Sequence, residues 1–176
     1  GTGKTMCASR LPGIMPDLTA EEIIDVNMIY SIASQSSSHS QWVSERPFRA
    51  PHSNSSMRAL IGGGPKILPG EISLAHKGIL FLDEFLEFHA DVLQALRTVL
   101  ERKEVFLSMR SGSSIYPADF LLIAAANPCP CGYYGDGDRC TCTPAKRLGY
   151  ISKLSGPLMD RIDIQLMVSR VDARLL

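Results

Sequence analysis

The sequence predicts an α/β fold with a mainly parallel sheet. Two uninterrupted apolar runs, residues 78–82 and 120–126, are typical of strands that are covered on both faces. Between them, residues 90–101 carry apolar side chains at the 3.6-residue spacing of an amphipathic helix. Strands that alternate with helices favour parallel pairing. With 176 residues, 45% hydrophobic and 20% charged, the chain fits one globular domain with a proper core.

The chain opens on part of a phosphate-binding motif. Residues 1–5 are the second half of the P-loop pattern G-x-x-x-x-G-K-[ST], although the same five residues also occur in ordinary turns. In an intact loop, backbone N–H groups of Gly1, Thr2 and Gly3 would cradle the phosphates. Lys4 would reach the β- and γ-phosphates, and the hydroxyl of Thr5 would bind Mg²⁺. We expect the rest of the motif, and the strand that feeds it, to lie upstream in a longer protein.

Two helices are predicted in the first part of the chain. Residues 6–11 are expected to form a short helix whose N-terminus points at the phosphates. Residues 19–22 form a capping box, and Ile23, Ile24 and Met28 are expected to continue the apolar face of a second helix toward Ala33. The serine-rich residues 34–40 then form a loop.

The middle of the chain is predicted to carry two irregular features. Residues 46–78 contain four prolines and a Gly-Gly-Gly run, which predicts a looped insertion with a functional role. Residues 105–116, split by Ser-Gly-Ser, predict a β-hairpin. The whole chain has 18 basic and 18 acidic residues, so its net charge gives no case for nucleic-acid binding. Residues 41–78 have five basic and two acidic residues, which suits a solvated surface or a loop that faces a polyanion.

Polar residues follow each apolar run. Asp83 and Glu84 end the first run, the pattern in which an Asp holds Mg²⁺, directly or through water, and a Glu polarises the attacking water. An Asp at such a corner can instead cap a helix. Asn127 follows the second run, where it could orient the water or contact the γ-phosphate, or simply make a turn. Ligands bind at this carboxyl edge in open α/β sheets.

Arg161 is the candidate for charge stabilisation across a subunit boundary. It follows a turn and an apolar pair at residues 156–160. An arginine can donate hydrogen bonds to the phosphate charge of the transition state from a neighbouring subunit, as an arginine finger does. The competing interpretation is a salt bridge with Asp160 or Asp163.

These motifs, in this order, resemble an AAA+ ATPase module. The amino-acid sequences of the motifs are similar to those of the Mg-chelatase-like YifB/ComM family. The resemblance runs from residue 1 to about residue 168. The segments that carry it are RPFRAPH (46–52), ALIGGG (59–64), PGEISLAH (69–76), GILFLDE (78–84), AANPCPCG (125–132) and SGPLMDRID (155–163).

The resemblance implies a role for each motif. It assigns Lys4 and Thr5 to Walker A and residues 83–84 to Walker B, and it makes Asn127 the sensor-1 residue and Arg161 the finger. It further implies that residues 46–78 contain the helix-2 insert, that residues 105–116 are the pre-sensor-1 hairpin, and that both protrude toward a ring pore. The helical lid with its sensor-2 arginine is expected outside these residues, so residues 1–176 alone should bind nucleotide poorly and hydrolyse it little.

The function that follows is an ATP- and Mg²⁺-dependent ring motor. For this family, the resemblance implies a ring, expected to be a hexamer, that remodels DNA. The remodelling would be helicase-like branch migration during recombination and uptake of foreign DNA. One alternative is the motor subunit of a metal chelatase, which shares the insert and the hairpin. Another is a non-catalytic nucleotide- or zinc-binding scaffold, although such a scaffold needs neither Glu84 nor Arg161.

Five cysteines complete the set of candidate residues. Cys129, Cys131, Cys140 and Cys142 form two C-x-C pairs that could close a tetrahedral site for structural Zn²⁺, or remain reduced thiols or a redox pair. Cys7 is expected to be a small packed residue. The cysteine pattern argues against a disulfide framework, and no apolar run is long enough to span a bilayer or to serve as a leader. A cytoplasmic protein without a membrane partner is therefore expected.

Overall fold

A parallel sheet of three strands forms the centre of the computed structural model, which describes residues 3–34, 42–135, 139–154 and 156–168. The strands are β1 (Phe48–Arg49), β4 (Ile79–Leu82) and β7 (Leu121–Ala124), in the order β1-β4-β7. Both pairings are parallel, with Ile79 opposite Phe48 on one side and opposite Leu121 on the other. The predicted α/β class with a mainly parallel sheet is confirmed.

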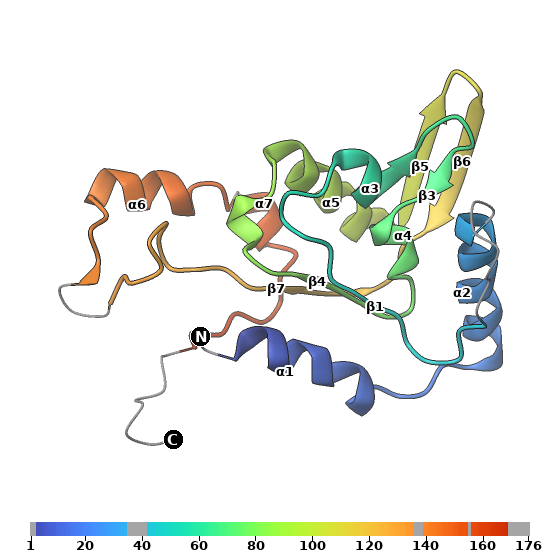
Figure 1. The fold of residues 1–176 in the computed structure, drawn as a ribbon, viewed down its shortest axis with the longest axis horizontal. Helices are drawn as coiled ribbons and strands as arrows, with labels where there is room; N and C mark the ends of the chain where they lie inside the picture. The colour runs from blue at the N-terminus through green and yellow to red at the C-terminus, as the bar shows by residue number, and fades with distance from the viewer. Residues whose placement is uncertain (1–2, 35–41, 136–138, 155, 169–176) are drawn as a thin grey trace.

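The other elements surround this sheet or project from it (Figure 1). Two antiparallel pairs lie outside the sheet: β2 (Gly62–Gly63) with β3 (Leu68–Pro69), and β5 (Glu104–Met109) with β6 (Gly112–Pro117). The helices are α1 (Lys4–Arg10), α2 (Ala20–Ala33), α3 (Met57–Ile61), α4 (Glu71–Leu74), α5 (Ala90–Arg102), α6 (Pro144–Ile151) and α7 (Gly156–Met159), with 3₁₀ turns η1 (Leu11–Ile14) and η3 (Phe85–Glu87).

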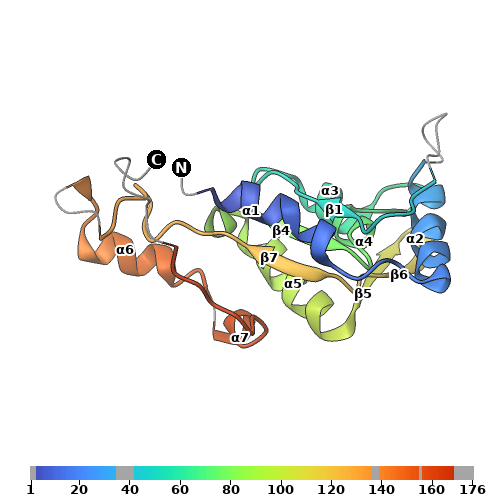
Figure 2. The ribbon, with the colours of Figure 1, turned by 90° about the horizontal axis from the view of Figure 1, so that it is seen from below.

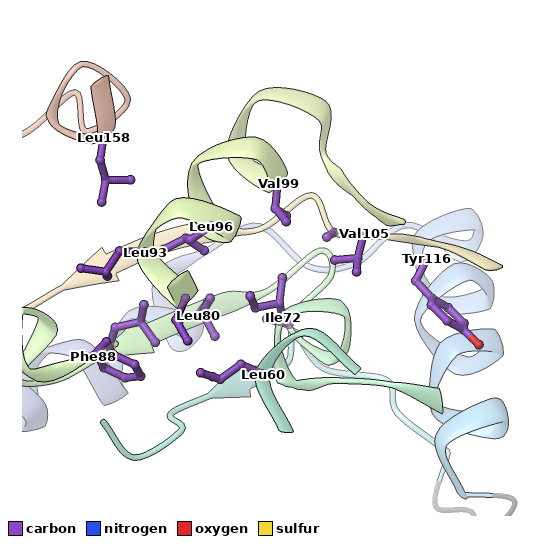
Figure 3. Close-up of a cluster of buried hydrophobic side chains, with 14 of the residues drawn as sticks. Leu60, Ile72, Leu80, Phe88, Leu93, Leu96, Val99, Val105, Tyr116 and Leu158 are labelled. Atoms are coloured by element: carbon purple, nitrogen blue, oxygen red, sulfur yellow. The ribbon is translucent and has the colours of Figure 1, made fainter. Parts of the chain in front are cut away.

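Strand β4 is buried on both faces because a helix covers each one. Its even-numbered residues, Leu80 and Leu82, belong to the large core cluster that includes Leu96 of α5. Its odd-numbered residues, Ile79 and Phe81, pack with α1 in a second, smaller cluster. Figure 1 shows α1 below the sheet and α5 above it, Figure 2 shows α1 in front of the sheet when it is seen from below, and Figure 3 shows the larger cluster. Each fully buried leucine stabilises the fold by about 1.5–3 kcal/mol relative to an exposed one.

The β5-β6 hairpin is fixed at its base. The backbone N–H of Ala118 donates to the carbonyl of Lys103 at 2.8 Å, and the Lys103 ammonium pairs with Asp119 at 3.0 Å. The hydroxyl of Tyr116 donates to the carbonyl of Ile67 at 2.7 Å. The hairpin therefore projects from the body as a braced unit (Figure 1). Its strands pair up to Met109 and Gly112, so the turn falls one residue earlier than the predicted Ser-Gly-Ser.

The region 46–78 contains more regular secondary structure than predicted. We expected an irregular insertion, but Phe48 and Arg49 form β1 of the central sheet, and the ring of Phe48 stacks on that of Phe81 at 6.1 Å. A two-residue strand carries too short a pattern to be recognised in a sequence. Helices α3 and α4 and the β2-β3 pair follow it, so only part of the region lies outside the sheet.

Two predictions of burial are wrong. Residues 120–126 do not form a fully buried strand, since Leu121 is 48% exposed and only β4 pairs with β7 among the described residues. The capping box of α2 is present, but Ile24 and Met28 are exposed and Ile23 is only half-buried, whereas Val26 and Ile29 are buried. The hydroxyl of the neighbouring Tyr30 donates to the carbonyl of Leu74 in α4. The face of α2 that packs on the protein is therefore the one with Val26, Ile29 and Tyr30, and not the predicted one.

No helix in the described part of the chain is both long and apolar enough to cross a membrane.

Candidate nucleotide site

Four of the predicted site residues meet at the carboxyl edge of the sheet. The hydroxyl of Thr5 donates to the Asp83 carboxylate at 2.8 Å, which joins the start of α1 to the end of β4. The ammonium of Lys4 donates to the carbonyl of Ala126 at 3.1 Å and to the side-chain oxygen of Asn127 at 3.4 Å, which joins α1 to the end of β7. Residues up to 123 positions apart in the chain are thus brought into one cluster.

The start of α1 has features of a helix terminus that could bind an anionic ligand. Gly3 caps the helix in the left-handed region with φ 71°, a conformation that glycine adopts without strain. Among the described residues no side-chain hydrogen bond caps this end, and the first N–H groups of an α-helix have no partner within the helix. The predicted helix over residues 6–11 is therefore present but begins earlier, at Lys4. Gly1 and Thr2, the other predicted phosphate-binding residues, lie outside the described residues.

The backbone on both sides of Asp83 and Glu84 is held by hydrogen bonds to Ala125, just beyond β7. The N–H of Ala125 donates to the carbonyl of Leu82, and the N–H of Phe85 donates to the carbonyl of Ala125, both at 2.9 Å. Glu84 itself has φ 51°, a left-handed conformation that costs a non-glycine residue about 1–2 kcal/mol. Its N–H donates to the second oxygen of Asp83 at 2.9 Å. Strain of this kind is concentrated at functional sites.

The donor set fits a nucleotide with Mg²⁺. The hydroxyl of Thr5 and the carboxylate of Asp83 are adjacent oxygen ligands, the kind that Mg²⁺ prefers, and the ammonium of Lys4 lies beside them. The competing role of Asp83 as a helix cap is not observed, since Glu84 occupies the capping position of η3 and no side-chain hydrogen bond caps that turn. One oxygen of Asp83 accepts the N–H of Glu84, and the other accepts the hydroxyl of Thr5.

Arg161 does not join this cluster. Its guanidinium pairs with the carboxylate of Glu101 at 2.5 Å, so neither predicted partner, Asp160 nor Asp163, makes the salt bridge. Glu101 lies in the last turn of α5. Because α5 carries the chain back from the end of β4, this turn lies away from the carboxyl edge of the sheet. Both side chains are about 40% exposed, at 40% and 38%.

The four clustered cysteines fit a tetrahedral metal site. Their sulfur atoms all lie within 4.8 Å of one another, with 3.8 Å for Cys129–Cys140 and Cys131–Cys140 and 3.3 Å for Cys129–Cys131. A tetrahedron with Zn–S bonds of about 2.3 Å has sulfur–sulfur distances of about 3.8 Å. A backbone hydrogen bond from Tyr133 lowers the pKa of Cys131 to about 6, which favours a thiolate. Desolvation and the neighbouring sulfur atoms raise the pKa of Cys140, and they raise that of Cys142 to about 11, so the metal fit rests on the geometry of the four sulfur atoms. Cys7, expected to be packed, is exposed on α1.

Helix α6, which the sequence analysis missed, connects the cysteines to the nucleotide edge. The end of α6 contacts η3, the turn that follows Glu84. Just beyond the helix, the ammonium of Lys153 donates to the carbonyl of Leu86 at 2.8 Å. Burial and a hydrogen bond with Glu87 raise the pKa of Tyr150 to about 12, and the same ring lies under Lys153. The signal that could have revealed α6 is its cap, Thr143 followed by a proline.

Fold and site together define a P-loop type of nucleotide-binding core: a parallel sheet with a Lys-Thr pair at a helix start and an Asp-Glu pair at a strand end. Comparison with known families is more specific. The model of the magnesium chelatase subunit ChlI family matches residues 1–176, and the chain belongs to this family.

Curated relatives narrow this assignment. The chain is 48% identical over 168 residues to YifB of Escherichia coli and 46% identical over 168 residues to the competence protein ComM of Haemophilus influenzae, each covering 96% of this chain and 33% of the relative. An uncharacterized protein of Mycobacterium tuberculosis is 47% identical over 174 residues, or 98% of this chain and 34% of the relative. The predicted Mg-chelatase-like protein of the YifB/ComM type is confirmed. The chain spans about a third of the length of these relatives.

Proposed function

We propose that this chain is the ATPase core of a ring motor that remodels DNA. The observation that carries the ATPase half is the convergence of Lys4, Thr5, Asp83 and Asn127 on one edge of the sheet. Membership of the magnesium chelatase family, which the sequence resemblance places among AAA+ ATPases, supports it. Bound Mg²⁺ would neutralise phosphate charge, and Thr5 and Asp83 are the residues that would hold it.

In this proposal the chain's own residues bind and orient. The ammonium of Lys4 and the N–H groups at the start of α1 bind the phosphates, together with Gly1, Thr2 and Gly3 of the P-loop. Glu84 accepts a proton from the attacking water as general base, a role worth about 10²–10⁴ in rate. Asn127 orients that water or contacts the γ-phosphate. Its amide oxygen already faces Lys4, so both side chains meet the same end of the nucleotide.

Arg161 is proposed to act on the neighbouring subunit. Its ion pair with Glu101 keeps it away from the nucleotide edge of its own chain, and its 40% exposure leaves it accessible to a partner. Head-to-tail contacts of this kind close into rings. We propose a hexamer in the cytoplasm, on the basis of the family resemblance.

The DNA half of the proposal is supported by a small basic group at the projecting end of the molecule. Most of the basic residues that gave the predicted local excess are used internally: Arg46 pairs with Glu22, Arg49 with Glu71, and Lys77 with Asp119. The exposed basic residues that remain in this part of the chain are Arg58 and Lys66, and Arg110 joins them from the hairpin turn.

These basic residues gather where the β2-β3 loop meets the hairpin turn. The guanidinium of Arg58 lies against Gly64, the methyl group of Met109 lies against Gly63, and Ile67 lies against Gly112. Phosphate contacts of this kind dominate affinity for nucleic acid and make it salt-dependent. We therefore propose residues 105–116 and the loop between β2 and β3 as the DNA-facing parts, the hairpin and the helix-2 insert of the family resemblance.

The test is ATP hydrolysis by the full-length protein, with and without forked and four-way DNA. We expect branched DNA to stimulate hydrolysis, Glu84→Gln to abolish turnover at every DNA concentration, and Arg110→Ala with Lys66→Ala to weaken the stimulation. Lys146→Ala, an exposed lysine on α6, is the matched control. A rate of ATP hydrolysis that is the same with and without DNA would favour the motor of a metal chelatase. Nucleotide binding without hydrolysis in the wild type would favour a scaffold.

A further inference from the structure

The cysteine cluster begins directly behind Asn127. Cys129 is fully buried, two residues beyond Asn127. The N–H of Gly132 donates to the carbonyl of Cys129 at 2.9 Å and turns the chain back on itself. Gly132 has φ 76°, and a Cβ atom there would lie 3.9 Å from the amide carbon of Asn127. The turn that carries the first two cysteines is thus in contact range of the side chain that faces Lys4.

The second cysteine pair leads into α6. Thr143 follows Cys142 and caps the helix with its hydroxyl, which accepts the N–H of Lys146 at 3.3 Å. At its other end, α6 docks on η3 through Tyr150 and Lys153. The cluster therefore lies between two segments of the proposed hydrolytic machinery, one that carries Asn127 and one that follows Glu84.

The sulfur atoms link these two segments, together with the Arg147 guanidinium of α6, which lies 4.4 Å from the centre of the Tyr134 ring. Two sulfur contacts of Cys140, with Cys129 and with Cys131 at 3.8 Å, join the second cysteine pair to the first. Thiols at that distance attract one another only weakly, whereas four thiolates on one Zn²⁺ form a closed tetrahedral site that contributes directly to folding. The phosphate-binding residues are held differently, since α1 packs on the sheet through Ala8 and Phe81.

We propose that the four cysteines bind one Zn²⁺ as a positioning centre for hydrolysis, which holds Asn127 at the nucleotide edge. This inference rests on the proposed ATPase function. Loss of the metal frees the turn behind Asn127 and the docking of α6, so turnover falls while nucleotide binding through Lys4 and Thr5 persists. The cysteines are positioning residues, because none of them lies among the groups that would touch the nucleotide.

The first experiment measures metal and kinetics together in the full-length protein. Elemental analysis is expected to find one zinc per chain in the wild type and in Cys7→Ser, and a loss of zinc in Cys140→Ser. We expect kcat to fall about 10–100-fold in Cys140→Ser, as for other changes around metal sites, with the Kd of a fluorescent ATP analogue unchanged. Cys140→His retains a zinc ligand and is expected to recover both metal and turnover. A wild type without zinc, or a parallel loss of nucleotide binding, overturns the proposal.

A double-mutant cycle tests whether the metal acts through Asn127. If it does, the effects of Cys140→Ser and Asn127→Ala on kcat are not multiplicative, and the double variant is scarcely slower than Asn127→Ala alone. If the cysteine site merely stabilises the fold, the two losses multiply, and the proposal is wrong.

Hydrogen exchange separates this inference from the ATPase proposal. Removal of zinc should speed exchange in residues 125–132 and in α6, and leave β4 unchanged, whether or not the protein hydrolyses ATP. A zinc-loaded protein with this response but without ATPase activity would contradict the proposed function and still support a metal that holds the Asn127 segment. Unchanged exchange in residues 125–132 would overturn the inference, even in an active enzyme.

Discussion

A mixture of two inactive variants tests whether Arg161 completes the site of a neighbouring subunit. Glu84→Gln removes the proposed base but keeps the arginine, and Arg161→Ala removes the arginine but keeps the base. Each variant alone is expected to be inactive, since a general base contributes about 10²–10⁴ and an arginine finger about 10³–10⁵ in rate. In a mixed ring, an intact site of one variant can meet the intact arginine of the other.

The size of the recovery follows from the head-to-tail arrangement. In an equimolar random mixture, half of the sites keep Glu84, and half of the neighbours of those sites keep Arg161. About one quarter of the interfaces therefore regain both groups, whatever the number of subunits in the ring. Steady-state ATP hydrolysis of the mixture should thus approach about one quarter of the wild-type rate per subunit.

Glu101→Gln is the matched control. It breaks the same ion pair as Arg161→Ala, and with it the pair between Arg97 and Glu101 at 3.6 Å, but leaves Arg161 in place. Because the side chains of Arg161 and Glu101 are 40% and 38% exposed, their ion pair contributes at most about 1 kcal/mol to stability. Glu101→Gln should therefore keep most of the hydrolysis rate. A mixture that stays as inactive as its components, although gel filtration shows mixed rings, would refute the action of Arg161 in trans.

Two further predictions concern the fold, both measured by chemical denaturation of the full-length protein. Leu96 is fully buried against β4, so Leu96→Ala should lower the free energy of unfolding by about 2–5 kcal/mol, whereas Leu148→Ala, at a position 73% exposed on α6, should change it by less than about 0.5 kcal/mol; equal effects would contradict the assigned core. Burial, aided by the charge of Lys77, lowers the pKa of His76, whose Nδ1 accepts the N–H of Asp119 at 3.0 Å. Since the unfolded chain then binds more protons, stability should fall as the pH drops below the unfolded-state pKa of about 6.5, and His76→Gln should remove this slope.

Long apolar patterns were the predictable part of the fold. The run before Asp83 indicated β4, and the periodicity of residues 90–101 indicated α5, because both elements bury side chains at a regular spacing. Strand β1 could not be predicted, since two residues have no period. Strand β7 is less buried than predicted, because an apolar run does not reveal how many strands pair with it, and among the described residues only β4 does.

The candidate site was partly predictable for a similar reason. Motif residues at strand ends and at a helix start must meet at one edge of a parallel sheet, and the contacts of Lys4 and Thr5 agree with this expectation. Their chemical roles remain proposals. Contacts between distant surfaces, such as Arg161 with Glu101 or Lys153 with η3, have no local pattern. Only the three-dimensional arrangement reveals them.

The braced base of the β5-β6 hairpin makes it a lever arm. Six residues of strand span about 20 Å, and the contacts of Lys103 and Tyr116 prevent the hairpin from bending where it leaves the body. A tilt of the body by about 10° therefore carries the turn through about 3–4 Å, close to the rise of one base pair. In the proposed ring motor, small rotations of each subunit would be magnified at the hairpin turn into steps about as long as the repeat of a nucleic-acid duplex.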